Sequence, residues 1–472
     1  MILRKKWHHN RGKDIYTTID ITIQDVAQDA LRRALIRHQA DHGCVVVMEV
    51  KTGKIRAIAN LGKRDSVNYF EYQNYAVGES TEPGSTFKVA TIAALMEDGV
   101  VNKNTKVNCG NGTAAFYNTT IKDHEPPATP LLDVKRIIEV SSNVGVAKLS
   151  FNNYGAAPSK FYKHLKNFGF TDVINIEVAG SKVPDLKKPE KWSGVSSAFI
   201  AHGYEIRITP LHTLQFYNAI ANNGNLVRPT LVDKITHYSK IIDSTKVASR
   251  KILNETTVAE LREILEGVVE QGTAMNLKTS YLKIAGKTGT AKIAQKNKGY
   301  SEAIYQASFC GYFPSQDPQY SMIVVVNSPS AGGYYGNVVA GSIFREVADK
   351  IYATDLQFDL LKEDSSSLNQ VKPFIAKSKA SDVERIYSSL GFKVEVPETQ
   401  WVQASNGQYK VFALKENLMP DVRGMSQRDA LYMLESIGLK ISFSGKGFVS
   451  NQSILPGEAI KKGQHVKLDL QS

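Results

Sequence analysis

Cysteine is scarce in this sequence, and its positions exclude two common kinds of site. The 472 residues include three cysteines, Cys44, Cys109 and Cys310. An odd number of widely spaced cysteines without a Cys-x-x-Cys pair argues against a disulfide framework and against a cysteine-bound metal. Cys44 and Cys310 lie in apolar runs typical of buried strands, whereas Cys109 lies in a segment typical of a loop. We therefore expect neither a metal ion nor another cofactor.

Long hydrophobic runs are also absent. No run of about 18 apolar residues occurs, so the sequence predicts no transmembrane helix. The first residues, Met1-Ile2-Leu3-Arg4-Lys5-Lys6-Trp7, lack the apolar stretch of a signal peptide. For an enzyme that acts outside the cytoplasm, this pattern predicts a chain whose N-terminal membrane anchor is missing.

Nucleic-acid-binding signatures are missing as well. The net charge of +12 is mild for this length, and no homeodomain, zinc-finger or RNA-recognition motif accompanies it, so no nucleic acid partner is expected. The charge indicates a lysine-rich solvated surface or, alternatively, attraction to an anionic cell wall or membrane. An apolar fraction of 42% and a charged fraction of 22% are typical of a globular protein.

The order of predicted elements indicates an α/β (α+β) fold with several parts. A helical periodicity runs from about Gln24 to His38, a hairpin follows in residues 44–59, late strands are expected near 307–313 and 320–326, and a last helix at 342–352. The first and last helices are expected to pack on one sheet, with the helices between them in a separate subdomain. The domain boundaries we expect are a basic, disordered start at 1–13, a large domain at 14–355, a linker with a short helix and strands at 356–417, and a small α+β module at 418–472.

One stretch carries a candidate nucleophile. Glu82-Pro83-Gly84-Ser85-Thr86-Phe87-Lys88 leads into an apolar run, which predicts a loop that feeds a helix. Ser85 and Lys88 are three residues apart and would share a helix face, about 5–6 Å from each other. A serine hydroxyl needs a neighbour that accepts its proton, and a lysine does this only when it is neutral. As a residue near a helix start, Lys88 is expected to contribute little to stability.

Two further motifs follow in order. Ser141-Ser142-Asn143 precedes an expected helix, and Lys287-Thr288-Gly289-Thr290 follows an expected strand at 282–286. Ser-x-x-Lys, Ser-x-Asn and Lys-Thr-Gly in this order form the motif set of penicillin-binding proteins and class A β-lactamases. Each motif alone has a structural interpretation: Ser141 as a helix N-cap, Asn143 as a plain helix residue, and the Lys287 motif as a turn at a strand end.

With their flanking residues, these motifs make residues 14–355 resemble the transpeptidase domain of class B penicillin-binding proteins, most closely the division-type (FtsI-like) enzymes. The resemblance implies a penicillin-binding-protein or serine-β-lactamase-like fold, a sheet flanked by helices. Met419-Pro420-Asp421-Val422-Arg423-Gly424-Met425 and the later Pro456-Gly457 make the tail similar to a PASTA domain. An alternative for the tail is a purely structural role.

The resemblance also implies an acyl-serine mechanism. Ser85 would attack the carbonyl between the terminal D-alanines of a stem peptide, Lys88 would take its proton, and Ser141 would pass a proton to the leaving D-alanine. Asn143 would bind Lys88 and the substrate amide, and Lys287 would supply positive charge. The backbone N–H groups of Ser85 and Thr290 would form the oxyanion hole. Substrate-binding residues would be Thr288, Gly289 and Thr290.

The implied partners are peptidoglycan stem peptides, covalently bound β-lactams and proteins of cell division or cell-wall synthesis, at the outer face of the cytoplasmic membrane. Three alternatives stay open. A class A β-lactamase would need a deacylating glutamate in a Glu-x-x-x-Asn pattern, and neither Glu177 nor Glu190 has Asn four residues on. A β-lactam or muropeptide sensor or scaffold, and an elongation-type transpeptidase, share all the motifs.

Overall fold

The structure is a computed structural model that describes residues 13–237, 240–293, 304–356, 375, 377–389, 392–405 and 408–471. The chain forms two compact units, Met1–Glu363 and Asp364–Ser472, which are described one at a time. The expected basic start before residue 13, the serine-rich stretch at 365–367 and the expected turn at Asn406-Gly407 lie outside the described residues. Among the described residues, no helix is both long and apolar enough to cross a membrane.

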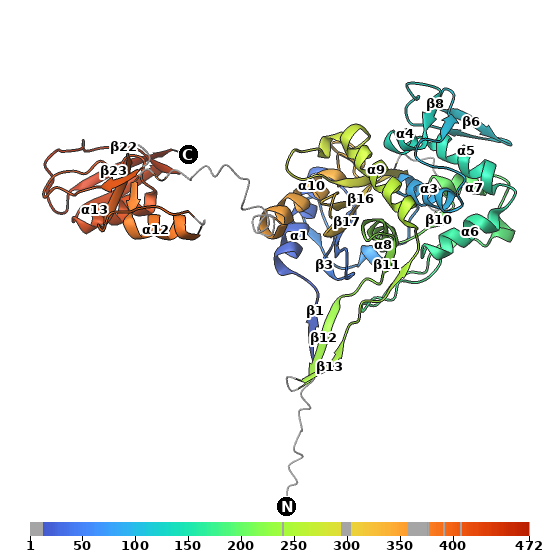
Figure 1. Ribbon diagram of the computed structural model, residues 1–472, viewed down its shortest axis with the longest axis horizontal. Coiled ribbons are helices and arrows are strands. Elements are labelled where there is room, and N and C mark those ends of the chain that lie inside the picture. Colours follow the sequence, from blue (N-terminus) through green and yellow to red (C-terminus); the bar gives the residue numbers. More distant parts are fainter. Residues whose placement is uncertain are drawn as a thin grey trace, which may run out of the picture. The chain divides into compact units, whose positions relative to one another are not determined.

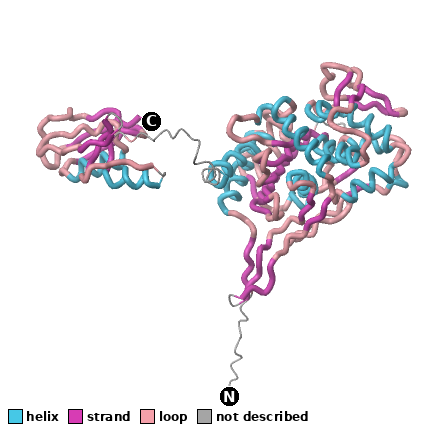
Figure 2. The backbone as a smooth tube through the Cα atoms, viewed as in Figure 1, coloured by secondary structure: helices cyan, strands magenta, loops and turns pink. Residues whose placement is uncertain are grey.

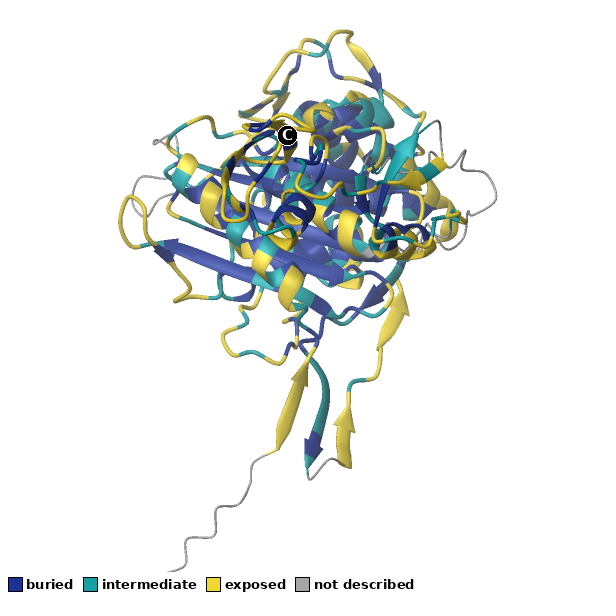
Figure 3. Cartoon of the chain, turned by 90° about the vertical axis from the view of Figure 1, so that its left-hand side faces the viewer, coloured by how far each residue is buried: buried dark blue, intermediate teal, exposed yellow. Residues whose placement is uncertain are grey.

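A six-stranded antiparallel sheet forms the centre of the first unit (Figures 1 and 2). The expected hairpin and the late strands join in this sheet although more than half of the unit separates them in sequence. The strand order is β15 (Ala285–Lys292), β16 (Tyr305–Phe313), β17 (Tyr320–Asn327), β2 (His42–Glu49), β3 (Ile55–Lys63) and β4 (Tyr69–Phe70). The central strands β2, β16 and β17 are almost wholly buried, as Figure 3 shows in dark blue, and Cys44 and Cys310 are core residues on two of them.

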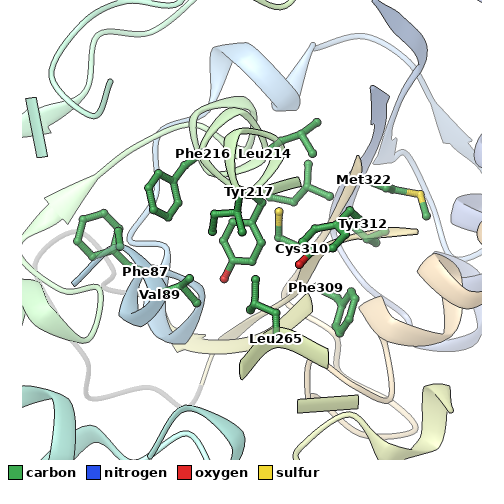
Figure 4. Packing of buried hydrophobic residues seen from close by; sticks show 14 of the residues in the cluster. Phe87, Val89, Leu214, Phe216, Tyr217, Leu265, Phe309, Cys310, Tyr312 and Met322 are labelled. Carbon is green, nitrogen blue, oxygen red and sulfur yellow. The ribbon is translucent and has the colours of Figure 1, made fainter. Parts of the chain in front are cut away.

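Helices cover the sheet. α1 (Ile21–Arg37) and α10 (Ala340–Ile351) contact each other and the sheet, so the expectation that the first and last helices pack on one sheet is confirmed. α1 begins at Asp20, whose carboxylate accepts hydrogen bonds from Thr22 N and Ile23 N. α8 (Pro210–Ala221) packs against β16 and β17, where Tyr217 lies beside Cys310, whereas Phe216 lies on the side of Phe87 (Figure 4).

In the sequence, a mainly helical subdomain lies between β4 and β15. Its helices are α3 (Lys88–Glu97), α4 (Val134–Glu139), α5 (Asn143–Tyr154), α6 (Pro158–Asn167) and α7 (Ser196–Ala201), and α9 (Glu255–Gln271) joins them to β15. Residues 99–133 contain short strands. β5 (Lys106–Asn108) pairs with β8 (Leu131–Asp133), and β6 (Thr113–Phe116) pairs with β7 (Thr119–Lys122).

Three strands form an arm that extends from the first unit (Figure 1). β12 (Val232–His237) lies between β1 (Asp14–Thr17) and β13 (Lys240–Ser244). β1 and β13 are exposed along their whole length, which Figure 3 shows in yellow. The arm therefore adds little to the buried core of the unit.

The second unit contains two small cores. The first belongs to β18 (Lys377–Lys379), α12 (Ala380–Ser389), β19 (Trp401–Ser405) and β20 (Gln408–Val411). The second belongs to α13 (Gln427–Ser436), β21 (Lys440–Gly445), β22 (Phe448–Gln452) and β23 (His465–Gln471), and it includes Trp401 of β19. Lys377 pairs with Asp421 at 3.1 Å, and Ser378 donates to Asp429 at 2.7 Å. The two parts of this unit thus pack together.

Candidate active site

Ser85 and Lys88 lie where a 3₁₀ helix, η1 (Gly84–Phe87), runs into α3. Ser85 is half-buried, whereas Lys88 is completely buried. The expectation that Lys88 contributes little to stability, as a residue near a helix start, is therefore wrong, because burial of an amine has a large energetic effect. Within the residues that the structure describes, the Ser85 hydroxyl makes no direct hydrogen bond. Ser85 and Lys88 thus lie on one continuous helical segment, and in this described part of the chain no hydrogen bond joins their side chains.

Hydrogen bonds to its backbone fix the turn that carries Ser85, η1 (Gly84–Phe87), which we call the serine turn. Gly84 N donates to Gly203 O at 3.2 Å, and the Tyr217 hydroxyl of α8 donates to Thr86 O at 2.8 Å. Gly84 has φ +57°, and a Cβ on Gly203 would lie 2.1 Å from Gly84 O. Two glycines are therefore required for this approach, and the turn has little freedom to move.

Lys88 reaches the second motif. Its Nζ donates to the Ser141 carbonyl oxygen at 2.5 Å and to Ser141 Oγ at 3.0 Å. Ser141 has φ +61°, a backbone conformation that is rare for residues other than glycine. The N-cap of α5 is Ser142, not Ser141, since Ser142 Oγ accepts from Gly145 N at 2.9 Å. The N-cap interpretation of Ser141 is thus wrong, and its side chain is available to Lys88.

Asn143 and Ser142 are tied to the end of β7. Asn143 Nδ2 donates to Lys122 O at 2.8 Å, and within the described residues it makes no hydrogen bond to Lys88. Ser142 Oγ donates to Asp123 Oδ2 at 2.8 Å, and Val144 N donates to Asp123 Oδ1 at 2.9 Å. Asp123 did not emerge from the sequence, because it belongs to no motif and its partners are far away along the chain.

The third motif lies within β15 itself. The strand includes Lys287-Thr288-Gly289-Thr290 and starts at Ala285, so the expectation that a strand at 282–286 delivers the motif is wrong. β15 is the edge strand of the sheet and contacts η1. A Cβ on Gly289 would lie 3.1 Å from Thr86 Cγ2 and 2.3 Å from Ser308 Oγ. The glycine thus permits the close approach of β15 to the serine turn.

The polar groups of β15 have defined partners. Lys287, completely buried, donates from Nζ to Thr288 O at 3.1 Å. The hydroxyls of Thr288 and Thr273 are 2.9 Å apart, and Gly336 N donates to Thr290 Oγ1 at 3.0 Å. The third motif therefore presents a buried amine and two anchored hydroxyl groups.

Burial changes the protonation of the basic groups. Desolvation lowers the pKa of Lys88 to about 7, although the negative charge of Asp123 acts in the opposite direction. Desolvation, and then the charge of Lys88, lowers the pKa of Lys287 well below its usual value. Desolvation and Lys88 also lower the pKa of His202 to about 3. A neutral amine at Lys88 is accessible near neutral pH, which a general base for a serine requires.

His202 has a structural contact of its own. It is buried, and its Nδ1 lies 2.7 Å from Ala198 O, so this nitrogen carries the proton. No group of three or more His, Cys, Asp or Glu residues in the described ranges is arranged to hold a metal ion. The described groups of the site are the Ser85 hydroxyl, the two amines of Lys88 and Lys287, and the hydroxyls of Ser141, Thr288 and Thr290.

Comparison with known proteins agrees with this arrangement. The profile described as "Penicillin binding protein transpeptidase domain" matches residues 43–349, which is more than half of the chain. This chain belongs to the penicillin-binding protein transpeptidase family. The PASTA domain profile matches residues 417–472 of this penicillin-binding protein, so the resemblance of its tail is confirmed.

Several curated proteins are similar to this penicillin-binding protein. A probable peptidoglycan D,D-transpeptidase PenA of Neisseria flavescens is 29% identical over 342 residues, which cover 71% of this chain and 81% of that protein. Stage V sporulation protein D of Bacillus subtilis is 26% identical over 97% of this chain and 65% of its own length. Peptidoglycan D,D-transpeptidase FtsI of Buchnera aphidicola is 28% identical over 72% and 58%. The chain thus spans less than two thirds of most of these relatives.

Solved structures share the fold. The transpeptidase domain of Burkholderia pseudomallei penicillin-binding protein 3 has a TM-score of 0.63 and 27% identity, over 72% of this chain and 96% of that one. Penicillin-binding protein 3 of Mycobacterium tuberculosis has a TM-score of 0.66 and 24% identity, over 76% and 81%. The expected fold class, a penicillin-binding-protein transpeptidase fold with a PASTA tail, is confirmed.

Proposed function

We propose that this chain is a peptidoglycan D,D-transpeptidase that cross-links stem peptides through an acyl-enzyme on Ser85. The observation that carries the proposal is the contact of Lys88, buried and with a pKa of about 7, with Ser141 Oγ at 3.0 Å. This contact joins the candidate base, Lys88, to a hydroxyl that can pass on a proton, Ser141 Oγ, on the segment that also carries the half-buried Ser85. The names of the PenA and FtsI relatives support the same reaction.

In the first half-reaction, Ser85 Oγ attacks the carbonyl between the two terminal D-alanines, and its proton passes to neutral Lys88. The tetrahedral intermediate collapses when the C–N bond breaks, and Ser141 passes a proton from Lys88 to the leaving D-alanine. In the second half-reaction, an amine of a neighbouring strand attacks the ester carbonyl, the C–Oγ bond to Ser85 breaks, and the proton that the amine loses passes through Lys88 to Ser85 Oγ. Backbone N–H groups of Ser85 and Thr290 stabilise both oxyanions.

The β15 residues bind the donor peptide. Burial and Lys88 lower the pKa of Lys287 in the free enzyme, but a bound carboxylate favours the charged form of this amine, so Lys287 supplies positive charge for the terminal carboxylate. Thr288 and Thr290 donate hydroxyl hydrogen bonds to the same carboxylate. Gly289 keeps the strand close to the serine turn. Because β15 is an edge strand, its free side offers backbone groups to an extended peptide. Asn143 orients the substrate amide, while its Nδ2 is anchored on Lys122 O.

A β-lactam tests the acyl-serine assignment. We expect intact-mass spectrometry to show one penicillin adduct and peptide mapping to place it on Ser85, with no adduct on a folded Ser85→Ala variant. The adduct is expected to be long-lived. Hydrolysis at tens per second would instead favour a β-lactamase, and a label on another residue would refute the assignment.

A peptide substrate separates a transpeptidase from a sensor. With a donor that ends in D-Ala-D-Ala and an acceptor amine, the enzyme is expected to release D-alanine and form the cross-linked product repeatedly. Acylation by penicillin without turnover of the peptide pair would favour the sensor or scaffold.

We further propose a septal role at the outer face of the cytoplasmic membrane, together with division proteins. The similarity to FtsI and PenA supports it, whereas Stage V sporulation protein D is an alternative that covers more of this chain. A fusion of this chain to the membrane anchor of a host FtsI should restore septation in cells depleted of FtsI. Restoration of elongation or spore formation instead would contradict the septal role.

A further inference from the structure

An aspartate outside the three motifs binds the turn that contains Ser141. Asp123 follows β7 directly, and its two carboxylate oxygens accept from different groups, the Ser142 hydroxyl at 2.8 Å and the Val144 backbone N–H at 2.9 Å. Its own backbone N–H donates to Gly112 O at 2.8 Å. Asp123 is therefore held by Gly112 through its backbone, and its carboxylate holds the start of α5 through Ser142 and Val144.

The turn that Asp123 holds includes Ser141, which contacts the candidate base Lys88. Ser141 adopts φ +61°, which L-residues rarely adopt without external support. This conformation brings both the carbonyl oxygen and Oγ of Ser141 to Lys88 Nζ. Hydrogen bonds to a carboxylate are stronger than those between neutral groups, so Asp123 is well suited to hold Ser142 and Val144 on the far side of the strained residue.

The charge of Asp123 acts on the same amine. The charged or titratable groups that interact electrostatically with Lys88 are Asp123, Lys287 of β15 and His202 after α7. His202 stays neutral, since its pKa falls to about 3. Asp123 is the acidic member of this set and raises the pKa of Lys88, against the desolvation that lowers it.

We propose that Asp123 is a positioning residue of the acylation site, which ties the Ser141 turn to the end of β7 and places a negative charge beside the buried amine of Lys88. The inference rests on the proposed acyl-serine function. It predicts two separable effects, one on the geometry of the turn and one on the proton of Lys88. A residue that only held the loop in place would affect the geometry of the turn and leave the proton of Lys88 unchanged.

The test is the pH dependence of penicillin acylation in the full chain. The wild-type rate should rise with pH through about 7, as Lys88 loses its proton. Asp123→Asn removes the charge and keeps one accepting oxygen, so the midpoint of this rise should move to lower pH, by about half a unit or more. Ser142→Ala removes one bond and keeps the charge, so its maximal rate should fall while its midpoint stays.

Asp133→Asn is the matched control. Asp133 is the N-cap of α4 and, like Asp123, accepts a hydrogen bond from a backbone N–H at a helix start, that of Arg136 at 2.7 Å, but it is not among the charges that act on Lys88. Its midpoint should equal that of the wild type. Melting curves verify that each variant is folded, and Asp123→Ser, which is also uncharged, replaces Asp123→Asn if that variant does not fold.

The outcomes separate the two proposals. A wild-type chain that penicillin does not acylate would refute the proposed function. A wild-type chain that is acylated, with an uncharged Asp123 variant whose midpoint is unchanged or higher, would overturn the role of Asp123 alone. An equal downward shift in Asp133→Asn would also overturn it, because the effect would then be one of net charge.

Discussion

Replacement of Lys88 by methionine should abolish acylation and yet stabilise the fold below neutral pH. Lys88 is completely buried, and its pKa falls from the ordinary 10.5 to about 7. Since each pKa unit corresponds to about 1.4 kcal/mol, keeping this lysine charged in the folded state costs roughly 5 kcal/mol. Methionine fills a similar volume without a charge.

The sign of the pH dependence follows from linkage. Below about pH 7, Lys88 is charged in the folded and the unfolded state, and the folded state bears the full cost. Between about 7 and 10.5, the folded state releases the proton while the unfolded state keeps it, so the free energy of unfolding of the wild type rises with pH. Above this window the cost is gone. The advantage of Lys88→Met should therefore be largest near pH 6 and fade toward pH 10.

Two lost hydrogen bonds reduce the gain. Methionine leaves the carbonyl oxygen and hydroxyl of Ser141 without their partner, at about 1–3 kcal/mol for an unsatisfied buried group. Because Ser141 is only half-buried, we take about 1–2 kcal/mol for each of its two groups and expect a net stabilisation of about 1–3 kcal/mol near pH 6. Lys160→Met, on an exposed lysine of α6, is the control and should change the free energy of unfolding by less than about 0.5 kcal/mol at any pH.

Calorimetry at pH 6, 7.5 and 9 measures the effect, and intact-mass spectrometry with penicillin measures the loss of acylation. The chain has two units, so the transition of the catalytic unit is identified in the wild type as the one that shifts upon acylation. A Lys88→Met variant that is less stable than the wild type near pH 6, or whose advantage does not depend on pH, would refute the reasoning. Acylation at the normal rate would refute the role of Lys88 as base.

Three further predictions concern the surroundings of the site. Asn143→Ala should slow penicillin acylation, by a smaller factor than loss of Lys88, because it removes the bond to Lys122 O; an unchanged rate would argue against a role for this amide. Gly203→Ala should lower the acylation rate by at least about tenfold, roughly 1.4 kcal/mol, because its Cβ would meet Gly84 O at 2.1 Å and φ is +90°; labelling at the wild-type rate would show that the serine turn tolerates displacement. A chain that ends at Thr354 should melt as a folded unit and be acylated at close to the full rate, since its core extends from Ile23 to Ile351; a tenfold loss of rate would show that the second unit helps to build the site.

The sequence was sufficient where structure depends on local patterns. The first helix, the first hairpin and the last helix of the catalytic unit follow from the periodicity of neighbouring residues. The short strands near residues 106–133 were not predicted, because turn-forming residues dominate the composition of that segment. β15 was placed too early, because the lysine and threonines of Lys287-Thr288-Gly289-Thr290 lack the apolar pattern by which a buried strand is predicted.

The chemistry of the site was harder to predict than its members. The three motifs point to Ser85, Lys88, Ser141 and Lys287 as candidates, but the burial of the two lysines depends on elements far apart in the chain that close around them. Asp123 has no sequence signal at all, because its contacts with Ser142 and Val144 arise only when β7 is brought beside the start of α5. Properties that depend on such tertiary contacts require the coordinates.

Trp401 has a practical consequence for dissecting the second unit. The PASTA profile begins at residue 417, yet the Trp401 side chain, 2% exposed, belongs to the core that residues 419–470 form. A peptide cut at the profile boundary would lose this indole, together with the partners of Asp421 and Asp429. Binding studies of an isolated tail should therefore begin near residue 375, because a shorter fragment could fail to bind its ligand through loss of its fold alone.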